Sequence, residues 1–143
     1  MVRRNFSSLE KNKKNSNSPH ELFKILIIDD DINFQKSLSF NLQQSYKGIK
    51  IVNAESGEIG LNYIKENGFH LIIIDLIMPT MDGAEVLRNI RKLKRDYKII
   101  VLTAFAKDEI LKQIEKEQPN EIFDKADFDI DKLMPYIEVS RKG

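Results

Sequence analysis

The sequence "LIIIDLIMPTMDG", residues 71–83, decides the fold that we predict for this chain. The apolar residues Leu71 to Ile74 come directly before Asp75, a pattern typical of a strand buried in the centre of a sheet. A carboxylate at the end of such a strand costs free energy unless a neighbouring group stabilises its charge. The proline and Gly83 that come after it are typical of a turn. The stretch therefore predicts a central strand whose last residue needs a charged partner.

Strand-like and helix-like patterns alternate on both sides of this stretch. The strand patterns cover residues 23–30, 49–54, 69–75, 97–104 and 120–126. The last of them is more polar, which predicts an edge strand. Apolar stripes at helical spacing follow each strand. They are Phe34, Leu38 and Leu42; Ile59, Tyr63 and Ile64; Val86, Ile90 and Leu93; Ile110, Leu111 and Ile114; and Ile130, Leu133, Met134 and Ile137.

The order of these patterns predicts the fold class. Strands that alternate with helices, without any internal repeat, form α/β proteins with a doubly wound, five-stranded parallel sheet flanked by helices. Only the final helix contains an interruption, Pro135, which lacks the backbone N–H that an α-helix needs.

Composition limits the class of protein. The chain has 143 residues, a formal net charge of +1 and no cysteine, so disulfides and thiolate metal sites are excluded. No apolar run reaches the roughly 18 residues of a membrane span, and no signal peptide is recognisable. We therefore expect a cytoplasmic protein without a membrane partner. Residues 1–20 are rich in Asn, Ser and Lys and carry five basic side chains against one acid, which predicts a disordered basic tail before a domain over 21–143.

Polar residues gather at the predicted carboxyl ends of the strands, where ligands bind in open parallel sheets. They are Asp29, Asp30, Asp75, Thr103 and Lys125. Three carboxylates that meet at one edge repel one another, and one of them tends to stay protonated. A Mg²⁺ ion removes this repulsion, because it prefers oxygen ligands and binds carboxylates together with phosphate and water. With the lysine and the hydroxyl, the set has the groups that phosphoryl transfer to an aspartate requires.

The chain from about Lys24 to Glu138 resembles the receiver domain of two-component response regulators. Four segments carry the resemblance: "ILIIDDD" (25–31), "LIIIDLIMPTMDG" (71–83), "IIVLTA" (99–104) and "FDKA" (123–126). The resemblance implies the flavodoxin-like form of the predicted fold. It also implies a phosphoprotein of a phosphorelay, which is a signalling switch rather than an enzyme with a separate substrate. Such a switch catalyses its own phosphorylation and dephosphorylation.

The resemblance also assigns roles around the predicted central strand. Asp75 matches the phosphoacceptor of the family. Asp30, assisted by Asp29, matches the Mg²⁺ site, and Asp75 and the backbone carbonyl of Ile77 match its further protein ligands. The charge of Asp75 is then stabilised by the metal site.

Thr103 matches the switch hydroxyl of the family and Lys125 its phosphate-binding lysine. Two positions depart from the family pattern. Ala126 stands where the family usually has a proline after a cis peptide bond, and we expect a trans bond because the cis form before a non-proline residue costs about 3–4 kcal/mol. Ile122 stands where the family favours an aromatic side chain that swings inward, and the adjacent Phe123 points to the opposite face of the strand.

Two further positions bear on how long the phosphoryl group persists. In the receiver family, the side chains two residues after the phosphoacceptor and two after the switch hydroxyl influence the water that hydrolyses the phosphoaspartate. Here they are Ile77 and Phe105. Neither offers a hydrogen bond to that water, and both are expected to cover the site with apolar bulk. We therefore expect slow self-dephosphorylation.

The resemblance implies partners as well. A sensor histidine kinase or a histidine phosphotransfer protein is the expected phosphodonor. The sequence predicts no output domain of its own and no direct DNA binding, so the signal is expected to pass to a separate effector protein that the sequence does not identify.

Two alternatives are open at this point. A phosphohydrolase of the haloacid dehalogenase type also carries an Asp-x-Asp motif on its first strand, and would use Asp29 as its nucleophile, with Asp75 secondary. A pseudo-receiver would bind partners without being phosphorylated. The intact set of Asp75, Asp30 and Lys125 argues against the pseudo-receiver.

Overall fold

The computed structural model describes residues 21–79, 81–93, 95–104 and 108–142, and these contain a five-stranded parallel sheet of order β2-β1-β3-β4-β5. The predicted fold class is confirmed. Strand β3 lies in the centre and β5 at one edge, as the sequence predicted. The strands are β1 (Phe23–Ile28), β2 (Ile49–Ala54), β3 (Leu71–Asp75), β4 (Lys98–Thr103) and β5 (Glu121–Asp124). The predicted tail over residues 1–20 lies outside the described residues.

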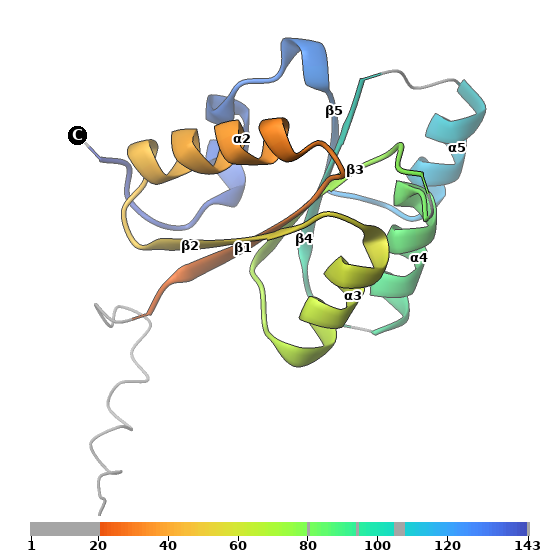
Figure 1. Ribbon diagram of the computed structural model, residues 1–143, viewed down its shortest axis with the longest axis horizontal. Helices are drawn as coiled ribbons and strands as arrows, with labels where there is room; N and C mark the ends of the chain where they lie inside the picture. The colour runs from red at the N-terminus through yellow and green to blue at the C-terminus, as the bar shows by residue number, and fades with distance from the viewer. Residues whose placement is uncertain (1–20, 80, 94, 105–107, 143) are drawn as a thin grey trace, which may run out of the picture.

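Helices cover both faces of the sheet (Figure 1). One face carries the three α-helices α3, α4 and α5, and the other carries α2 with the 3₁₀ helices η1 and η2. Their bounds are α2 (Ile32–Ser45), α3 (Gly57–Glu66), α4 (Gly83–Lys92), α5 (Asp108–Lys116), η1 (Lys125–Asp127) and η2 (Ile130–Tyr136). No helix among the described residues is long and apolar enough to cross a membrane.

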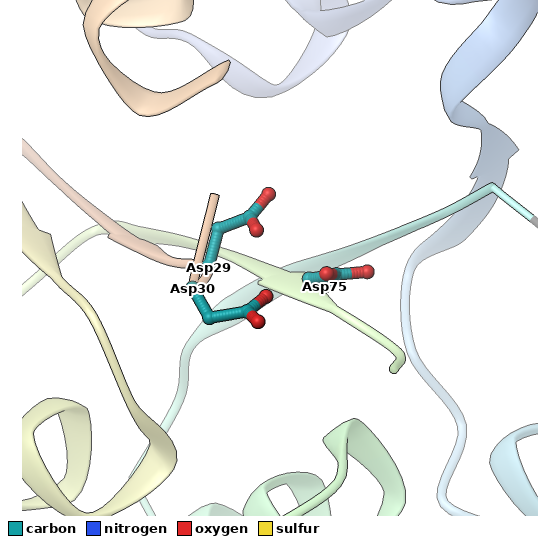
Figure 2. A group of neighbouring side chains, drawn as sticks. All are labelled: Asp29, Asp30 and Asp75. Atoms are coloured by element: carbon teal, nitrogen blue, oxygen red, sulfur yellow. The ribbon is translucent and has the colours of Figure 1, made fainter. Parts of the chain in front are cut away.

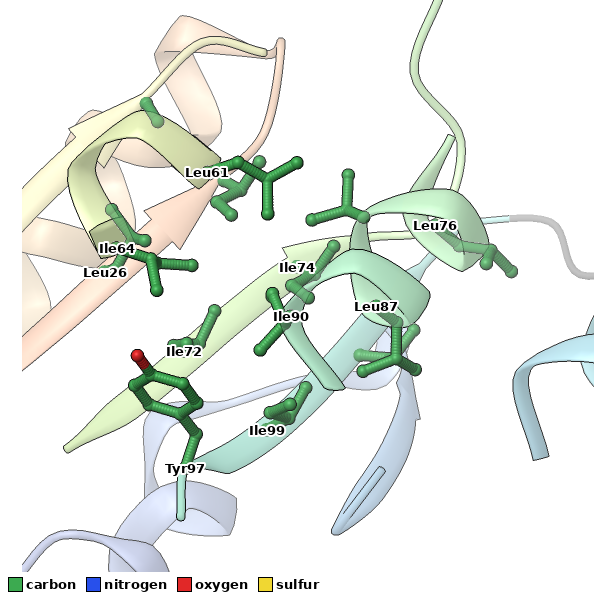
Figure 3. Packing of buried hydrophobic residues seen from close by; sticks show 14 of the residues in the cluster. Leu26, Leu61, Ile64, Ile72, Ile74, Leu76, Leu87, Ile90, Tyr97 and Ile99 are labelled. Carbon is green, nitrogen blue, oxygen red and sulfur yellow. The ribbon is translucent and has the colours of Figure 1, made fainter. Parts of the chain in front are cut away.

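The alternation of side chains along β3 divides its apolar run between two cores. Ile72 and Ile74 point into the cluster under α3 and α4 (Figure 3), whereas Leu71 and Ile73 point into the cluster under α2 and η2. All four are at most 1% exposed. A strand covered on both faces needs a continuous apolar sequence, and this explains the run that precedes Asp75.

The segment after β5 differs from the prediction. The stripe Ile130, Leu133, Met134 and Ile137 predicted an α-helix, but residues 130–136 form the 3₁₀ helix η2 with Pro135 inside it. Proline cannot donate an α-helical hydrogen bond, and a 3₁₀ helix repeats every three residues. The inner side of η2 is therefore Ile130, Leu133 and Tyr136, while Met134 turns outward and is 48% exposed.

A smaller correction concerns α3. Ile59 was predicted on the buried stripe of this helix but is 42% exposed. The buried side of α3 includes Gly60 and Ile64, because α3 packs closely on β1 at Gly60. A Cβ atom at this glycine would lie 2.5 Å from Cδ1 and 2.7 Å from Cγ1 of Ile28, so any larger residue here would force the side chain of Ile28 to move.

The end of the described chain is attached to the end of α2. Tyr46 and Arg141 form an isolated antiparallel bridge, and the N–H of Lys142 donates to the carbonyl of Ser45 at 2.7 Å. The guanidinium of Arg141 lies 2.8 Å from the carboxylate of Asp131 in η2. These contacts hold the 3₁₀ segment against α2 without a regular helix.

Candidate functional site

The acidic pair, Asp29 and Asp30, follows β1 directly. The N–H of Asp29 donates to the carbonyl of Ala54 in β2 at 3.0 Å, which continues the sheet by one residue. Oδ1 of Asp29 accepts from the N–H of Asp31 at 2.9 Å. Asp31 in turn caps α2, since its Oδ1 accepts from the N–H of Phe34 at 3.0 Å. Asp29 is 2% exposed, while Asp30 is exposed to solvent.

Asp75 is the last residue of β3 and is 7% exposed. Its Oδ1 accepts from the N–H of Ile77 at 3.3 Å. The turn after β3 brings Gly83 back against the strand end, where a Cβ atom would lie 2.6 Å from the carbonyl oxygen of Asp75 and 2.7 Å from Cα of Leu76. Only glycine fits this approach, and the turn thereby fixes the backbone that carries Asp75.

The sheet brings the three predicted carboxylates together (Figure 2). Asp29, Asp30 and Asp75 each contribute one oxygen to a group in which all lie within 4.8 Å of one another. Burial and, secondly, the charge of Asp29 raise the pKa of Asp75 to about 6, while Lys125 acts in the opposite direction. The contribution of the Asp29 charge to this shift is the repulsion between carboxylates that the sequence predicted. Receiver domains bind Mg²⁺ at such a cluster, and the oxygen donors present here fit that ion.

Lys125 reaches the same cluster from the edge of the sheet. Its Nζ lies 2.8 Å from Oδ2 of Asp29, 3.6 Å from Oδ2 of Asp75 and 4.4 Å from the ring centroid of Phe34. Burial alone would lower the pKa of Lys125, but the hydrogen bond to Asp29 and the charges of Asp29, Asp75 and Asp31 raise it. The lysine is therefore held as a cation beside Asp75.

Thr103 is the last residue of β4 and is 4% exposed. Its Oγ1 is buried and has no hydrogen-bond partner among the described residues. A buried hydroxyl without a partner costs about 1–3 kcal/mol. The hydroxyl thus keeps a free donor next to the strand that leads to Lys125.

The two atypical positions lie where the sequence placed them. Ile122 packs on the cluster under α3 and α4, and Phe123 on the opposite cluster, so the predicted alternation is confirmed. The Lys125–Ala126 peptide bond is trans, also as predicted. The N–H of Ala126 donates to Oδ1 of Asp124 at 2.9 Å, which begins η1.

The two positions assigned to the lifetime of the phosphoryl group differ in what the structure describes. Ile77 is 47% exposed, so its side chain does not bury against the site, and the apolar cover predicted at this position is not found. Phe105 lies outside the described residues.

Two residues next to the site were missed by sequence reasoning, Phe34 and Gln35. Phe34 was interpreted only as a core position of α2, but its ring faces Lys125. Gln35 stands on the inner side of α2 and bonds to the backbone of Asp29. Its one signal in the sequence was a polar residue beside the apolar stripe of Leu38 and Leu42.

Sequence comparison connects this geometry with known proteins. The chain is 36% identical over 86 residues to the alkaline phosphatase synthesis transcriptional regulatory protein PhoP of Bacillus subtilis (strain 168), which is 60% of this chain and 34% of that protein. It is also 38% identical over 87 residues to the probable C4-dicarboxylate response regulator DctR of the same organism. The aligned residues make up 60% of this chain and 38% of that protein. The matched part therefore spans little more than a third of these regulators.

Solved structures agree with the sequence matches. A CheY-like response regulator receiver domain protein from Methanospirillum hungatei JF-1 has 27% identity and a TM-score of 0.70, with 80% of this chain and 90% of that chain covered. A response regulator receiver protein from Pseudomonas putida has 25% identity and a TM-score of 0.73, with 80% and 94% covered. The family model described as response regulator receiver domain matches residues 25–138. This chain belongs to the response regulator receiver domain family.

Proposed function

We propose that this chain is a phosphorylation-dependent signalling switch in which Asp75 accepts the phosphoryl group. The observation that carries the proposal is the position of Asp75 at the buried end of β3, with Asp29 and Asp30 on one side and the ammonium of Lys125 at 3.6 Å. In the alternative phosphohydrolase, Asp29 would be the nucleophile. Both carboxylates contact Lys125 and one backbone N–H, but the contacts of Asp29, at 2.8 and 2.9 Å, are shorter than those of Asp75, at 3.6 and 3.3 Å, so Asp29 is less free to react.

The chemistry follows from the charges of these groups. A carboxylate oxygen of Asp75 forms a bond to phosphorus as the bond between phosphorus and the donor's leaving group breaks. Lys125 neutralises part of the charge on the transferred group, and the free hydroxyl of Thr103 donates to one of its oxygens.

Asp29, Asp30, Asp75 and the backbone carbonyl of Ile77 would hold a Mg²⁺ ion, which supplies positive charge to the phosphoryl oxygens when bound. Without the ion, burial and the charge of Asp29 favour the protonated form of Asp75, as its raised pKa shows. The residues present would therefore depend on the metal to keep the nucleophile ionised at moderately acidic pH.

Partners follow from the family. A sensor histidine kinase or a histidine phosphotransfer protein is the proposed donor, and a separate effector protein the proposed recipient of the signal. That the chain acts without an output domain or DNA contact stays a prediction, because the matched region is only 34% of the length of a relative named as a transcriptional regulator.

Intact mass spectrometry after incubation with acetyl phosphate and Mg²⁺ tests the proposal. The wild type should gain one phosphoryl group. Asp75→Asn should gain none. The labelling of Asp30→Ala should no longer depend on Mg²⁺. Asp131→Asn, which changes an exposed acid paired with Arg141, is the control and should behave as the wild type. Unchanged labelling of Asp75→Asn would refute the proposal.

We further propose that the phosphoryl group persists, because Ile77 and Phe105 give the hydrolytic water no hydrogen-bond partner. Replacing Ile77 with Asn and Phe105 with Glu should accelerate loss of the group about tenfold, or about 1.4 kcal/mol in the barrier. The exposed side chain of Ile77 leaves room for an Asn amide at this position. The decay of the labelled species after removal of the donor measures this. Loss within seconds in the wild type would contradict it.

A further inference from the structure

The side chain of Gln35 is a buried polar group that the proposed chemistry does not use. It is 3% exposed and lies on the inner side of α2 with Leu38 and Leu42, which are 4% and 0% exposed. A buried amide costs free energy unless it is hydrogen-bonded, and an apolar residue would fill this place without that cost. The bonds of Gln35 should therefore show why it is polar.

The Gln35 amide donates two hydrogen bonds to backbone carbonyls at the carboxyl ends of β1 and β2. Its Nε2 donates to the carbonyl of Asp29 at 2.8 Å and to the carbonyl of Ala54 at 2.7 Å. The N–H of Asp29 itself donates to the carbonyl of Ala54 at 3.0 Å. One amide group thus joins α2, the end of β1 and the end of β2 at the residue that begins the acidic pair.

The peptide that Gln35 holds is the one between Asp29 and Asp30. Fixing the carbonyl of Asp29 fixes the plane of this peptide, and this plane contains the Cα atoms from which both carboxylates project. Mg²⁺ demands near-ideal octahedral geometry and tolerates misplaced ligands poorly. Removal of groups that hydrogen-bond to metal ligands and orient them commonly lowers metal affinity.

We propose that Gln35 is a positioning residue that presets the acidic pair for Mg²⁺. The inference rests on the proposed function, because it takes Asp29 and Asp30 as metal ligands. Gln35 is not among the residues that would hold the ion or the phosphoryl group, because its Nε2 donates to the backbone carbonyls of Asp29 and Ala54. It acts through the backbone of Asp29.

A second polar link from α2 to β2 provides a comparison within the same helix. One turn after Gln35, the side chains of Ser39 and Asn53 bond to each other at 3.2 Å. This link is not buried, and among the described residues it has no bond to the acidic pair. If α2 merely needed attachment to β2, the two links would be equivalent. The proposal predicts that they are not.

The test is calorimetric titration of the unphosphorylated protein with Mg²⁺. Gln35→Met keeps the length of the side chain and removes both donors, and should raise the Mg²⁺ dissociation constant about tenfold. Ser39→Ala should leave this constant unchanged. With acetyl phosphate, Gln35→Met should require more Mg²⁺ for half-maximal labelling, while the rate at saturating Mg²⁺ stays within about twofold of the wild type, since the ion then restores the geometry.

Further variants separate positioning from general stability. Leu38→Val removes one buried methylene from the same side of α2 and should lower stability without changing Mg²⁺ affinity. Gln35→Asn keeps an amide that is one methylene too short, and should weaken Mg²⁺ binding less than Gln35→Met. If Gln35→Met does not fold, the Mg²⁺ affinity of Gln35→Asn tests the proposal in its place.

The outcomes are distinct. Wild-type Mg²⁺ affinity in both Gln35 variants, or an equal loss in Leu38→Val, would overturn the inference while leaving the proposed function intact. A wild type that neither binds Mg²⁺ nor accepts a phosphoryl group would overturn both.

Discussion

The end of β3 and the end of β5 each deliver one charged residue to the site, and they do so in different ways. Asp75 ends a central strand whose five residues are all buried, and a glycine turn then packs back against it. Lys125 follows a four-residue edge strand whose residues are at most half-buried, and begins a 3₁₀ helix. The sheet therefore fixes Asp75, the proposed nucleophile, through its backbone, whereas Lys125 is fixed through contacts of its side chain.

The segments after these two strands show the same contrast. The turn after β3 leads into α4, a regular helix capped by the carboxylate of Asp82, which accepts from the N–H of Glu85 at 2.9 Å. The chain after β5 runs through η1 and η2 and reaches the end of α2. We infer that the region after β5 is the less stable of the two, because 3₁₀ hydrogen bonds have poorer geometry than those of an α-helix.

The largest effect is expected from Leu133→Ala in η2. Leu133 is 0% exposed and belongs to the core under α2. Removing it should lower the free energy of unfolding by about 2–4 kcal/mol, measured by urea titration. Met134→Ala, at the neighbouring exposed position, should change this free energy by less than about 0.5 kcal/mol. Equal effects of the two substitutions would show that η2 does not pack as an inner and an outer side.

The second prediction concerns the buried charge at the end of β3. The pKa of Asp75 is raised from 3.8 to about 6, so the folded chain holds a proton that the unfolded chain releases between these two values. Stability should therefore decrease as the pH rises from 4 to 6, and stay lower above 6. Without Mg²⁺, Asp75→Asn should be more stable than the wild type by about 2–3 kcal/mol at pH 7 and equally stable near pH 4.

Thermal or urea unfolding across this pH range checks the prediction. Added Mg²⁺ should stabilise the wild type at pH 7, since it binds only the folded site, and should stabilise Asp75→Asn much less. A difference between the two proteins that does not depend on pH would show that the charge of Asp75 is not the cause.

The charged residues at the strand ends were predictable from the sequence. Gln35, which bonds to the backbone of Asp29, was not. The apolar runs and their order define a parallel sheet, whose topology alone brings Asp29, Asp30, Asp75 and Lys125 to one edge. No motif marks Gln35, because a single amide beside an apolar stripe can also be an exposed helix residue. Only the packing of α2 shows that it is buried and bonded to Asp29.

The structure after β5 could not be predicted from periodicity. The stripe from Ile130 to Ile137 fits the spacing of an α-helix, and the same residues fit a 3₁₀ helix with Met134 left outside. Pro135 was the feature that favoured the second arrangement, since it removes an α-helical donor. The sequence does not show that Arg141 pairs with Tyr46 at the end of α2, so it could not decide between the two arrangements.

The smallest effect is expected at the contact that holds the cation. Phe34→Leu keeps apolar bulk beside Lys125 but removes the aromatic face that lies 4.4 Å from its Nζ. The rate of phosphorylation by acetyl phosphate should fall by about three- to fivefold, which corresponds to about 0.6–1 kcal/mol. Phe34→Tyr retains the aromatic face and should keep the wild-type rate. If both variants lose the same activity, bulk rather than the ring positions Lys125.

The identity of the phosphorylated residue is the central claim, and chemical trapping tests it most directly. Borohydride reduces an aspartyl phosphate to homoserine, with release of phosphate, and so marks the reacted position permanently. After treatment with acetyl phosphate, Mg²⁺ and then borohydride, tandem mass spectrometry of the peptide that contains residue 75 should find homoserine in place of Asp75, and the peptide that contains Asp29 and Asp30 should be unchanged. Homoserine at position 29 or 30, with Asp75 intact, would contradict the proposed function.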